Sequence, residues 1–167
     1  MGETLEARLA RLEDKAAIGD VLTAIARGTD RFDPDLLASA IWPDAALDMG
    51  GAEPMQGAAF CAALRPPATA RPGRMHLLTN TRIEVTGDSG RAESYILSFQ
   101  DVMVDGVRTT RVRGGRYLDR FEKRDGRWGL IRRTLIDEWG RLDAVGEIVP
   151  PGRHLGAPAP LDLSYTS

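Results

Sequence analysis

Three glycine-containing turn signals divide the second half of the chain into four extended segments. The signals are Gly87-Asp88-Ser89-Gly90, Asp105-Gly106 and Asp125-Gly126. Short turns of this composition join neighbouring strands as β-hairpins. We therefore expect an antiparallel meander with strands at about 75–86, 91–104, 107–122 and 127–139. The pair Gly114-Gly115, inside the third of these strands, predicts a bulge or a sharp bend in the sheet.

The first half of the chain is helical in pattern. Apolar residues recur at helical spacing from Leu5 to about Thr29, and Asp33-Pro34 is typical of a helix start. This second helix should end before Pro43, followed by a short strand at 45–49 and a third helix at about 58–64. A bent sheet can curl around such a helical layer, so we expect an α+β fold. Residues 1–145 form the predicted domain, and 146–167 a proline-rich, irregular C-terminal tail.

Composition narrows the classes of partner. The chain has 167 residues, enough for one domain, and a net charge of −2, which gives no electrostatic case for binding nucleic acid or an anionic membrane. No apolar run reaches membrane-spanning length and no signal peptide opens the sequence, so we expect a cytoplasmic protein. The single cysteine and the absence of a Cys/His cluster predict no metal and no cofactor.

Histidine is scarce, and only one of the two is well placed for chemistry. His154 lies in the Pro/Gly-rich tail, whereas His76 begins an extended segment in which alternation puts His76, Leu78 and Asn80 on one face. An imidazole titrates near neutrality and is the natural general base at cellular pH. It needs a partner that stabilises the imidazolium, and Asp30 at the end of the first helix is the candidate.

Five runs of the sequence carry a family resemblance. They are Ile18–Asp30, Trp42-Pro43-Asp44-Ala45, Met75–Asn80, Gly114–Glu122 and Asp125–Thr134. In the same order over about residues 5–140, they resemble SnoaL-like proteins of the nuclear-transport-factor-2-like (NTF2-like) superfamily. This resemblance implies a cone-shaped α+β barrel whose strongly curved antiparallel sheet wraps around N-terminal helices.

Within that superfamily the pattern is similar to scytalone dehydratase and hexachlorocyclohexane dehydrochlorinase. The resemblance implies an Asp–His dyad in which His76 removes a proton and Asp30 orients it. Arg133 matches an arginine that assists a departing anion, although a slip of one residue would turn Arg132 inward instead. Ile25 stands where many relatives have a tyrosine. This difference indicates chemistry other than that of scytalone dehydratase itself.

These features predict a cofactor-independent lyase acting on a small, mostly apolar, aromatic substrate. Dehydratase, dehydrohalogenase and aldehyde-releasing carbon–carbon lyase activities all fit. An isomerase or polyketide cyclase using the same dyad is the alternative, and a non-catalytic ligand-binding or dimerisation module is the third reading. The exposed sheet and the long tail favour a homo-oligomer, either dimer or trimer. Candidate substrate-binding residues are Trp42, Asn80, Tyr95, Phe99 and Tyr117.

Overall fold

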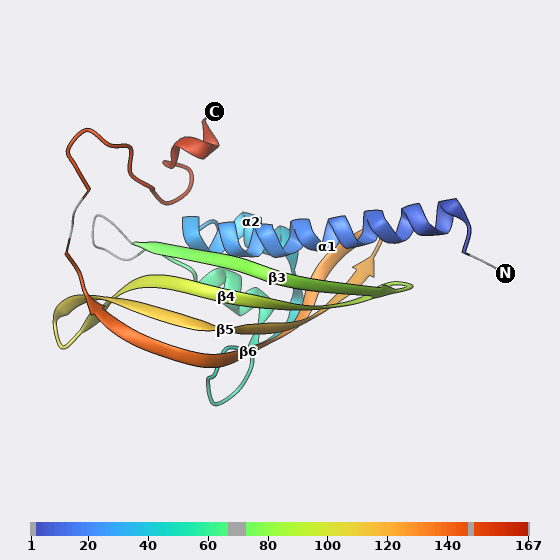
Figure 1. The fold of residues 1–167 in the computed structure, drawn as a ribbon, viewed down its shortest axis with the longest axis horizontal. Coiled ribbons are helices and arrows are strands. Elements are labelled where there is room, and N and C mark those ends of the chain that lie inside the picture. Colours follow the sequence, from blue (N-terminus) through green and yellow to red (C-terminus); the bar gives the residue numbers. More distant parts are fainter. Residues whose placement is uncertain (1–2, 67–72, 147–148, 167) are drawn as a thin grey trace.

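The computed structural model describes residues 3–66, 73–146 and 149–166. The elements, in chain order, are α1 (Leu5–Arg31), α2 (Pro34–Ala40), β1 (Ile41–Asp48), β2 (Met55–Gln56), α3 (Gly57–Ala63), β3 (Arg74–Thr86), β4 (Ser89–Val104), β5 (Val107–Arg124), β6 (Arg127–Ala144) and a 3-10 turn (Leu163–Tyr165). Figure 1 shows α1 lying along one face of a curved sheet. No described helix is both long enough and apolar enough to cross a bilayer.

The meander from β3 to β6 is antiparallel throughout, which confirms the strands expected from the turn signals. At the β4–β5 and β5–β6 turns, both central residues have positive φ: Asp105 and Gly106, then Asp125 and Gly126. Positive φ at both central residues matches the right-handed twist of the flanking strands. Local turn chemistry therefore determines these two strand pairings.

The other edge of the sheet differs from the expectation. The strand order is β2-β1-β6-β5-β4-β3, and β1 runs parallel to β6, so the six-stranded sheet is mixed rather than wholly antiparallel. Hairpin signals specify only pairs of strands that follow each other in the chain. β1 and β6 are far apart in sequence, and no local signal sets their relative direction.

Glycine allows the sheet to bend where the sequence predicted it. The β5–β6 register shifts between Gly114 and Gly115, confirming the predicted bulge. A Cβ atom on Gly115 would lie 2.2 Å from the carbonyl oxygen of Ile136, so only glycine fits there. A second shift lies between Arg120 and Phe121. The long strands curve together beneath α1 (Figure 1).

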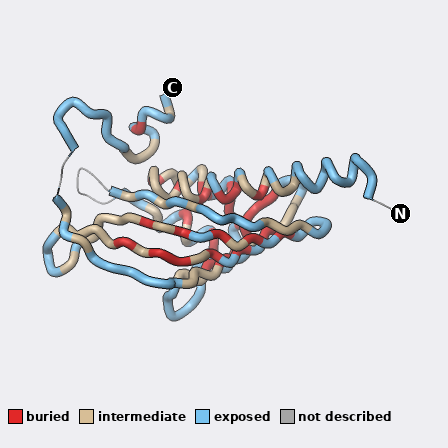
Figure 2. The backbone as a smooth tube through the Cα atoms, in the orientation of Figure 1, coloured by how far each residue is buried: buried red, intermediate tan, exposed pale blue. Residues whose placement is uncertain are grey.

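Helix α1 has two halves with different surroundings. Its N-cap Thr4 accepts a hydrogen bond from the backbone N–H of Ala7 at 3.2 Å, and the helix continues without a break through Gly19. Ile18, Leu22 and Ile25 are buried in the core. Residues 5–13 are exposed, and the N-terminal end of the helix projects past the end of the sheet (Figure 2).

The C-terminal tail returns to the opposite end of α1 (Figure 1). The hydroxyl of Tyr165 donates to Asp33 Oδ2 at 2.7 Å, and the carboxylate of Asp162 lies 3.4 Å from the guanidinium of Arg31. The backbone N–H of Ala159 donates to the carbonyl of Arg31 at 2.7 Å. These bonds fasten an otherwise irregular segment to the end of the helix that carries Asp30.

Candidate active site

Asp30 and His76 meet where the last turns of α1 cross the start of β3. The ring Nδ1 of His76 lies 2.6 Å from Asp30 Oδ1, and the backbone N–H of His76 donates to Asp30 Oδ2 at 3.0 Å. The two side chains are only 9% and 12% exposed. Asp30 therefore holds both the backbone and the ring of His76, which fixes the orientation of the imidazole.

Two neighbours determine which ring nitrogen of His76 carries the proton and which carries the lone pair. The carboxylate of Asp30 only accepts, so Nδ1 carries the proton of the neutral imidazole. Gln100 lies on the other side, with its amide nitrogen 3.3 Å from His76 Nε2. Its amide oxygen is held at 2.6 Å by the guanidinium of Arg111, which can only donate. The Gln100 amide group thus donates to Nε2, and the lone pair of His76 is on Nε2.

A cavity of about 120 Å³ lies beside this dyad, between α1, α3 and the inner face of the sheet. A smaller space of about 40 Å³ adjoins it and shares His76, Gln100, Tyr117 and Met49. The helical wall is mostly apolar and the sheet wall carries the polar groups, an arrangement typical of small-molecule sites. The larger cavity is lined by Ile25, Ala26, Thr29, Met49, Phe60, Leu64, Arg74, His76, Leu78, Gln100, Tyr117 and Arg133.

Arg133, not Arg132, faces this cavity. Its guanidinium makes two hydrogen bonds to Asp119, at 2.8 and 2.7 Å, and lies 3.9 Å above the ring of Tyr117. Burial alone would lower the pKa of Arg133, but Asp119 outweighs it and the pKa is raised. Arg132 is exposed on the opposite face of the sheet. The positive charge of Arg133 is already matched by a buried carboxylate.

Tyr117 is the one predicted aromatic side chain that lines the cavity. Burial is the main cause of a raised pKa for its phenol, opposed by the neighbouring charge of Arg133. The phenol therefore stays protonated at neutral pH, and it is a hydrogen-bond donor within the cavity.

Two predicted aromatic residues on β4 point the wrong way. His76 pairs with Ser98 across β3 and β4, so the even-numbered residues of β4 share the inner face with His76. Tyr95 and Phe99 are therefore on the outer face, and neither lines the cavity. The prediction that Tyr95 and Phe99 bind substrate in this cavity is therefore wrong.

Trp42 and Asn80 also lie outside the cavity. The indole N–H of Trp42 donates to the carbonyl of Glu122 at 3.1 Å, and its ring packs against the guanidinium of Arg127 at 3.8 Å. Asn80 is exposed, with φ of 49°, at the shift in register between β3 and β4. This bulge ends the alternation that would have placed Asn80 beside His76. Trp42 is part of the hydrophobic core instead, and Asn80 is exposed.

The sequence analysis missed two polar residues at the site, Arg74 and Gln100. Arg74 is two residues before His76 on β3, so alternation along that strand would have identified it. Gln100 pairs with Arg74 across the sheet, but the register set by the turn at 87–90 shifts between Thr79 and Arg82. Without that shift His76 would pair with Phe99, so the turn alone could not have identified Gln100.

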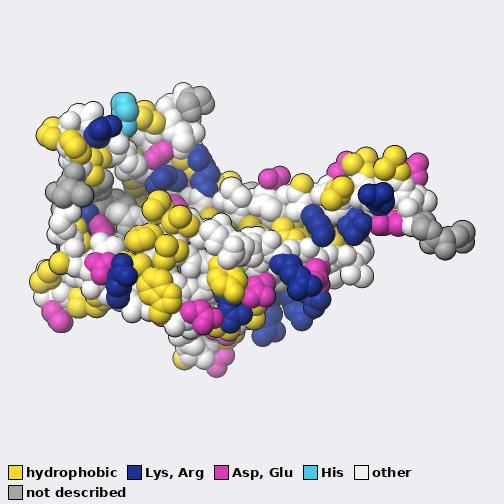
Figure 3. Space-filling view, in the orientation of Figure 1, with side chains coloured by type: hydrophobic (Ala, Val, Ile, Leu, Met, Phe, Trp, Pro, Cys, Tyr) yellow, Lys and Arg dark blue, Asp and Glu magenta, His cyan; other side chains and the backbone are white. Residues whose placement is uncertain are grey.

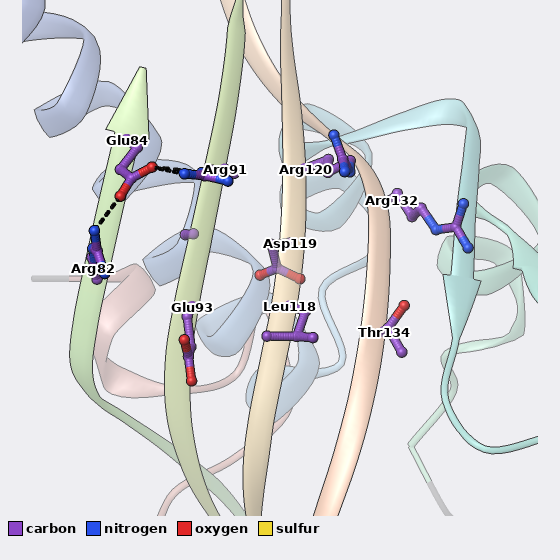
Figure 4. A pocket seen from close by; sticks show the side chains of 10 residues that line it. Arg82, Glu84, Arg91, Glu93, Leu118, Asp119, Arg120, Arg132 and Thr134 are labelled. Carbon is purple, nitrogen blue, oxygen red and sulfur yellow. Dashed lines mark hydrogen bonds and ion pairs between the residues drawn. The ribbon is translucent and has the colours of Figure 1, made fainter. Parts of the chain in front are cut away.

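A larger depression lies on the outer face of the sheet, with a volume of about 620 Å³. Figure 4 shows four arginines around it, Arg82, Arg91, Arg120 and Arg132, with Glu84 bridging the first two. Its three carboxylates, Glu84, Glu93 and Asp119, are all paired with arginines, and no histidine lines it. We therefore assign the candidate active site to the smaller cavity beside His76.

The sequence matches the profile of the SnoaL-like domain over residues 10–134. The chain belongs to the SnoaL-like family. No curated protein matches it significantly. In the parts of this SnoaL-like chain that the structure describes, no three His, Cys, Asp or Glu side chains gather as metal ligands would.

Solved structures agree with this family fold. A hexachlorocyclohexane dehydrochlorinase (LinA) type 2 shares 24% identity over 87% of this SnoaL-like chain and 99% of its own, with a TM-score of 0.73. A LinA type 3 from Novosphingobium barchaimii shares 25% identity over 86% and 99%, also with a TM-score of 0.73. A putative scytalone dehydratase from Novosphingobium aromaticivorans shares 23% over 85% and 95%, with a TM-score of 0.69.

Proposed function

We propose that the protein is a cofactor-independent lyase in which His76 is the general base and the substrate is small, mostly apolar, and aromatic or alicyclic. The observation that carries this proposal is the 2.6 Å contact between Asp30 Oδ1 and Nδ1 of a histidine that lines the cavity. Asp30 fixes the proton on Nδ1, and Nε2 is left as the acceptor beside the cavity. The names of two structural relatives, a dehydrochlorinase and a putative scytalone dehydratase, denote eliminations.

The elimination uses groups that already line the cavity. His76 Nε2 takes a proton from a substrate carbon, and the electrons of that C–H bond form the new double bond. The bond to the leaving group breaks and its electron pair departs with the halide or oxygen. Asp30 stabilises the imidazolium through Nδ1–H, at no cost in reorganisation because the bond already exists.

Tyr117 is the residue best placed to stabilise the leaving group. Its protonated phenol lines the cavity with His76, and the guanidinium of Arg133 behind its ring favours negative charge near the phenol oxygen. Arg133 itself donates to the carboxylate of Asp119 from Nε and from one terminal nitrogen. We therefore assign Arg133 an indirect role, through Tyr117, in place of direct contact with the departing anion.

Two other reactions use the same base. Abstraction of a hydroxyl proton would drive retro-aldol-like cleavage with release of an aldehyde. Return of the abstracted proton to another carbon would give isomerisation or cyclisation. A non-catalytic binding module would not need Asp30 within 2.6 Å of a histidine that lines a cavity.

The test compares His76→Ala with His154→Ala, which removes the exposed histidine of the tail. A panel of aromatic and alicyclic alcohols and halides is assayed for halide, aldehyde and alkene products. His76→Ala should lower turnover by about 10²–10⁴-fold with an unchanged circular dichroism spectrum, and His154→Ala should behave as the wild type. Turnover by His76→Ala at the wild-type rate would refute the proposal. Double-bond migration without a released group would replace the lyase with an isomerase.

A further inference from the structure

A row of three polar side chains lies next to the dyad on the inner face of the sheet. Arg74 on β3 pairs with Gln100 on β4, and Gln100 pairs with Arg111 on β5. The adjacent row contains His76 and Ser98. Two residues along a strand are about 6.5–7 Å apart, so the arginine row is roughly that far from His76.

The arginines on the inner face of the sheet near the cavity fall into two classes. Arg133 is bonded to Asp119, and Arg113 is bonded to Asp137 through two nitrogens. For Arg74 and Arg111, by contrast, no carboxylate in residues 3–66, 73–146 or 149–166 lies within ion-pair distance.

Each of these two guanidiniums is only partly satisfied. Arg74 lines the cavity and lies 5.1 Å from the centre of the Phe32 ring, a cation–π contact. Arg111 donates to the amide oxygen of Gln100, yet its Nε is buried and has no acceptor among the described residues. A buried N–H group without a partner costs stability, and such groups are rare in folded proteins.

This row carries an excess of positive charge. Burial lowers the pKa of Arg74; the charge of Asp30 opposes this effect, and the charge of Arg111 adds to it. Asp30 is itself committed to His76 through both oxygens. One bound anion would compensate both guanidiniums and could supply the missing acceptor for Arg111.

We infer that the substrate carries a carboxylate, which Arg74 and Arg111 bind on either side of Gln100 while the reacting carbon lies at His76 Nε2. A planar carboxylate matches the fork of a guanidinium. The spacing of about 6.5–7 Å between the rows is close to the length of a six-membered ring with its acid group. This substrate class, an arene- or cyclohexane-carboxylic acid, rests on the proposed function of His76 and differs from uncharged hexachlorocyclohexane.

The experiment measures binding directly, by isothermal titration calorimetry, with benzoate, cyclohexanecarboxylate and the neutral isostere benzamide. Arg74→Gln and Arg111→Gln should weaken binding of the two carboxylates by about 10–100-fold, the value of a charged hydrogen bond, and leave benzamide unchanged. Arg74→Lys, which keeps the charge, should retain part of the affinity. Arg120→Gln is the matched control, because it removes an exposed arginine from the outer face.

Equal affinity of the wild type for benzoate and benzamide would overturn the inference, as would wild-type affinity in both Arg74→Gln and Arg111→Gln. His76→Ala separates this result from the proposed function, because its carboxylate binding should persist while turnover is lost. Carboxylate selectivity with turnover unaffected by His76→Ala would refute the proposed lyase alone. Turnover that depends on His76 but prefers neutral substrates would refute the carboxylate site alone.

Discussion

At the scale of single residues, the site is determined by what each group can donate or accept. The chain Arg111–Gln100–His76–Asp30 has a cation at one end and a carboxylate at the other. Every bond in it runs in one direction, from guanidinium to amide oxygen, from amide N–H to Nε2 and from Nδ1–H to carboxylate. This direction places the proton of Nδ1 toward Asp30 and the lone pair of Nε2 toward Gln100.

Gln100→Glu tests that arrangement with an almost isosteric change. The new carboxylate would accept from His76 Nε2 and form an ion pair with Arg111, so the imidazole would lie between two carboxylates. We expect it to be protonated on both nitrogens at pH 7, with turnover lowered by about 10²–10⁴-fold and an increased melting temperature. Nitrogen-15 NMR of the ring measures the protonation of both sites.

Gln100→Leu is the control for this prediction, since it removes the amide without adding an acceptor. His76 should then keep a proton on Nδ1 alone, held by Asp30. A neutral ring in Gln100→Glu would show that Gln100 does not contact His76 as the structure places it.

At the scale of elements, features encoded by neighbouring residues were predictable and those that depend on distant contacts were not. The hairpins, the bulge at Gly114-Gly115 and the cap at Asp33 all follow from local chemistry. The pairing of β1 with β6 does not, because it joins segments about 90 residues apart. The residues alone offered the pair Asp30 and His76 as one possibility, and family resemblance made it the predicted dyad, since a separation of 46 residues has no local signal.

Strand parity explains most of the errors at the site. If the register of the turn at 87–90 continued unchanged, His76 would pair with Phe99, and Tyr95 and Phe99 would share its face. The shift in register after Thr79 instead places both aromatic residues on the outer face. The bulge after Thr79 removed Asn80 from the inner face, and a bulge cannot be located from alternation alone. The same ambiguity left Arg132 and Arg133 open until the β5–β6 register was known.

Asp33 connects α2 to the C-terminal tail, and its charge makes the stability of this attachment depend on pH. Its Oδ1 accepts from the backbone N–H of Leu36 as the N-cap of α2, and its Oδ2 accepts from the Tyr165 hydroxyl. Burial would raise the pKa of Asp33, but the bonds from Leu36 and Tyr165 outweigh it and the pKa is lowered. A lowered folded-state pKa means that this stability is present above the unfolded value of about 3.9 and is lost as the pH falls through the folded value.

Tyr165→Phe therefore should lower stability at pH 5–8 and have little effect in acid. We expect a loss of about 0.5–1.5 kcal/mol for the hydrogen bond, and Asp33→Ala should cost more because it also removes the cap of α2. Urea unfolding of the wild type and Tyr165→Phe between pH 3 and 7 measures this difference. A gap between the two proteins that persists unchanged at pH 3 would contradict the assignment.

At the scale of the whole molecule, the exposed N-terminal end of α1 carries leucines that no described part of the chain covers. Leu5, Leu9 and Leu12 are 78%, 54% and 61% exposed. At 100° per residue they form one stripe on the side of the helix opposite Ile18 and Leu22, which face the core. Figure 3 shows hydrophobic atoms along the outer side of this projecting end. We propose that this stripe joins two copies of the chain in the expected homo-oligomer.

The charges beside the stripe favour a particular pairing. With Leu9 and Ala16 at position a of a heptad, Glu6, Glu13 and Asp20 occupy the e positions, and Arg8 and Lys15 the g positions. In a parallel pair, each acidic flank faces the partner's basic flank. In an antiparallel pair, like charges would meet. Charge complementarity therefore selects a parallel contact between two copies of α1.

Leu9→Lys places a charge in the centre of this contact, where burial is costly. Analytical ultracentrifugation across a concentration series should show the wild type associating and Leu9→Lys shifted toward the monomer by about tenfold or more in dissociation constant. Leu161→Lys is the matched control, because Leu161 lies in the tail and is 79% exposed. A wild-type chain that is monomeric at all concentrations, or a Leu9→Lys variant that associates like the wild type, would exclude α1 as the interface. In the latter case, the outer face of the sheet becomes the surface to test, since it carries the exposed aromatic side chains of Tyr95 and Trp139.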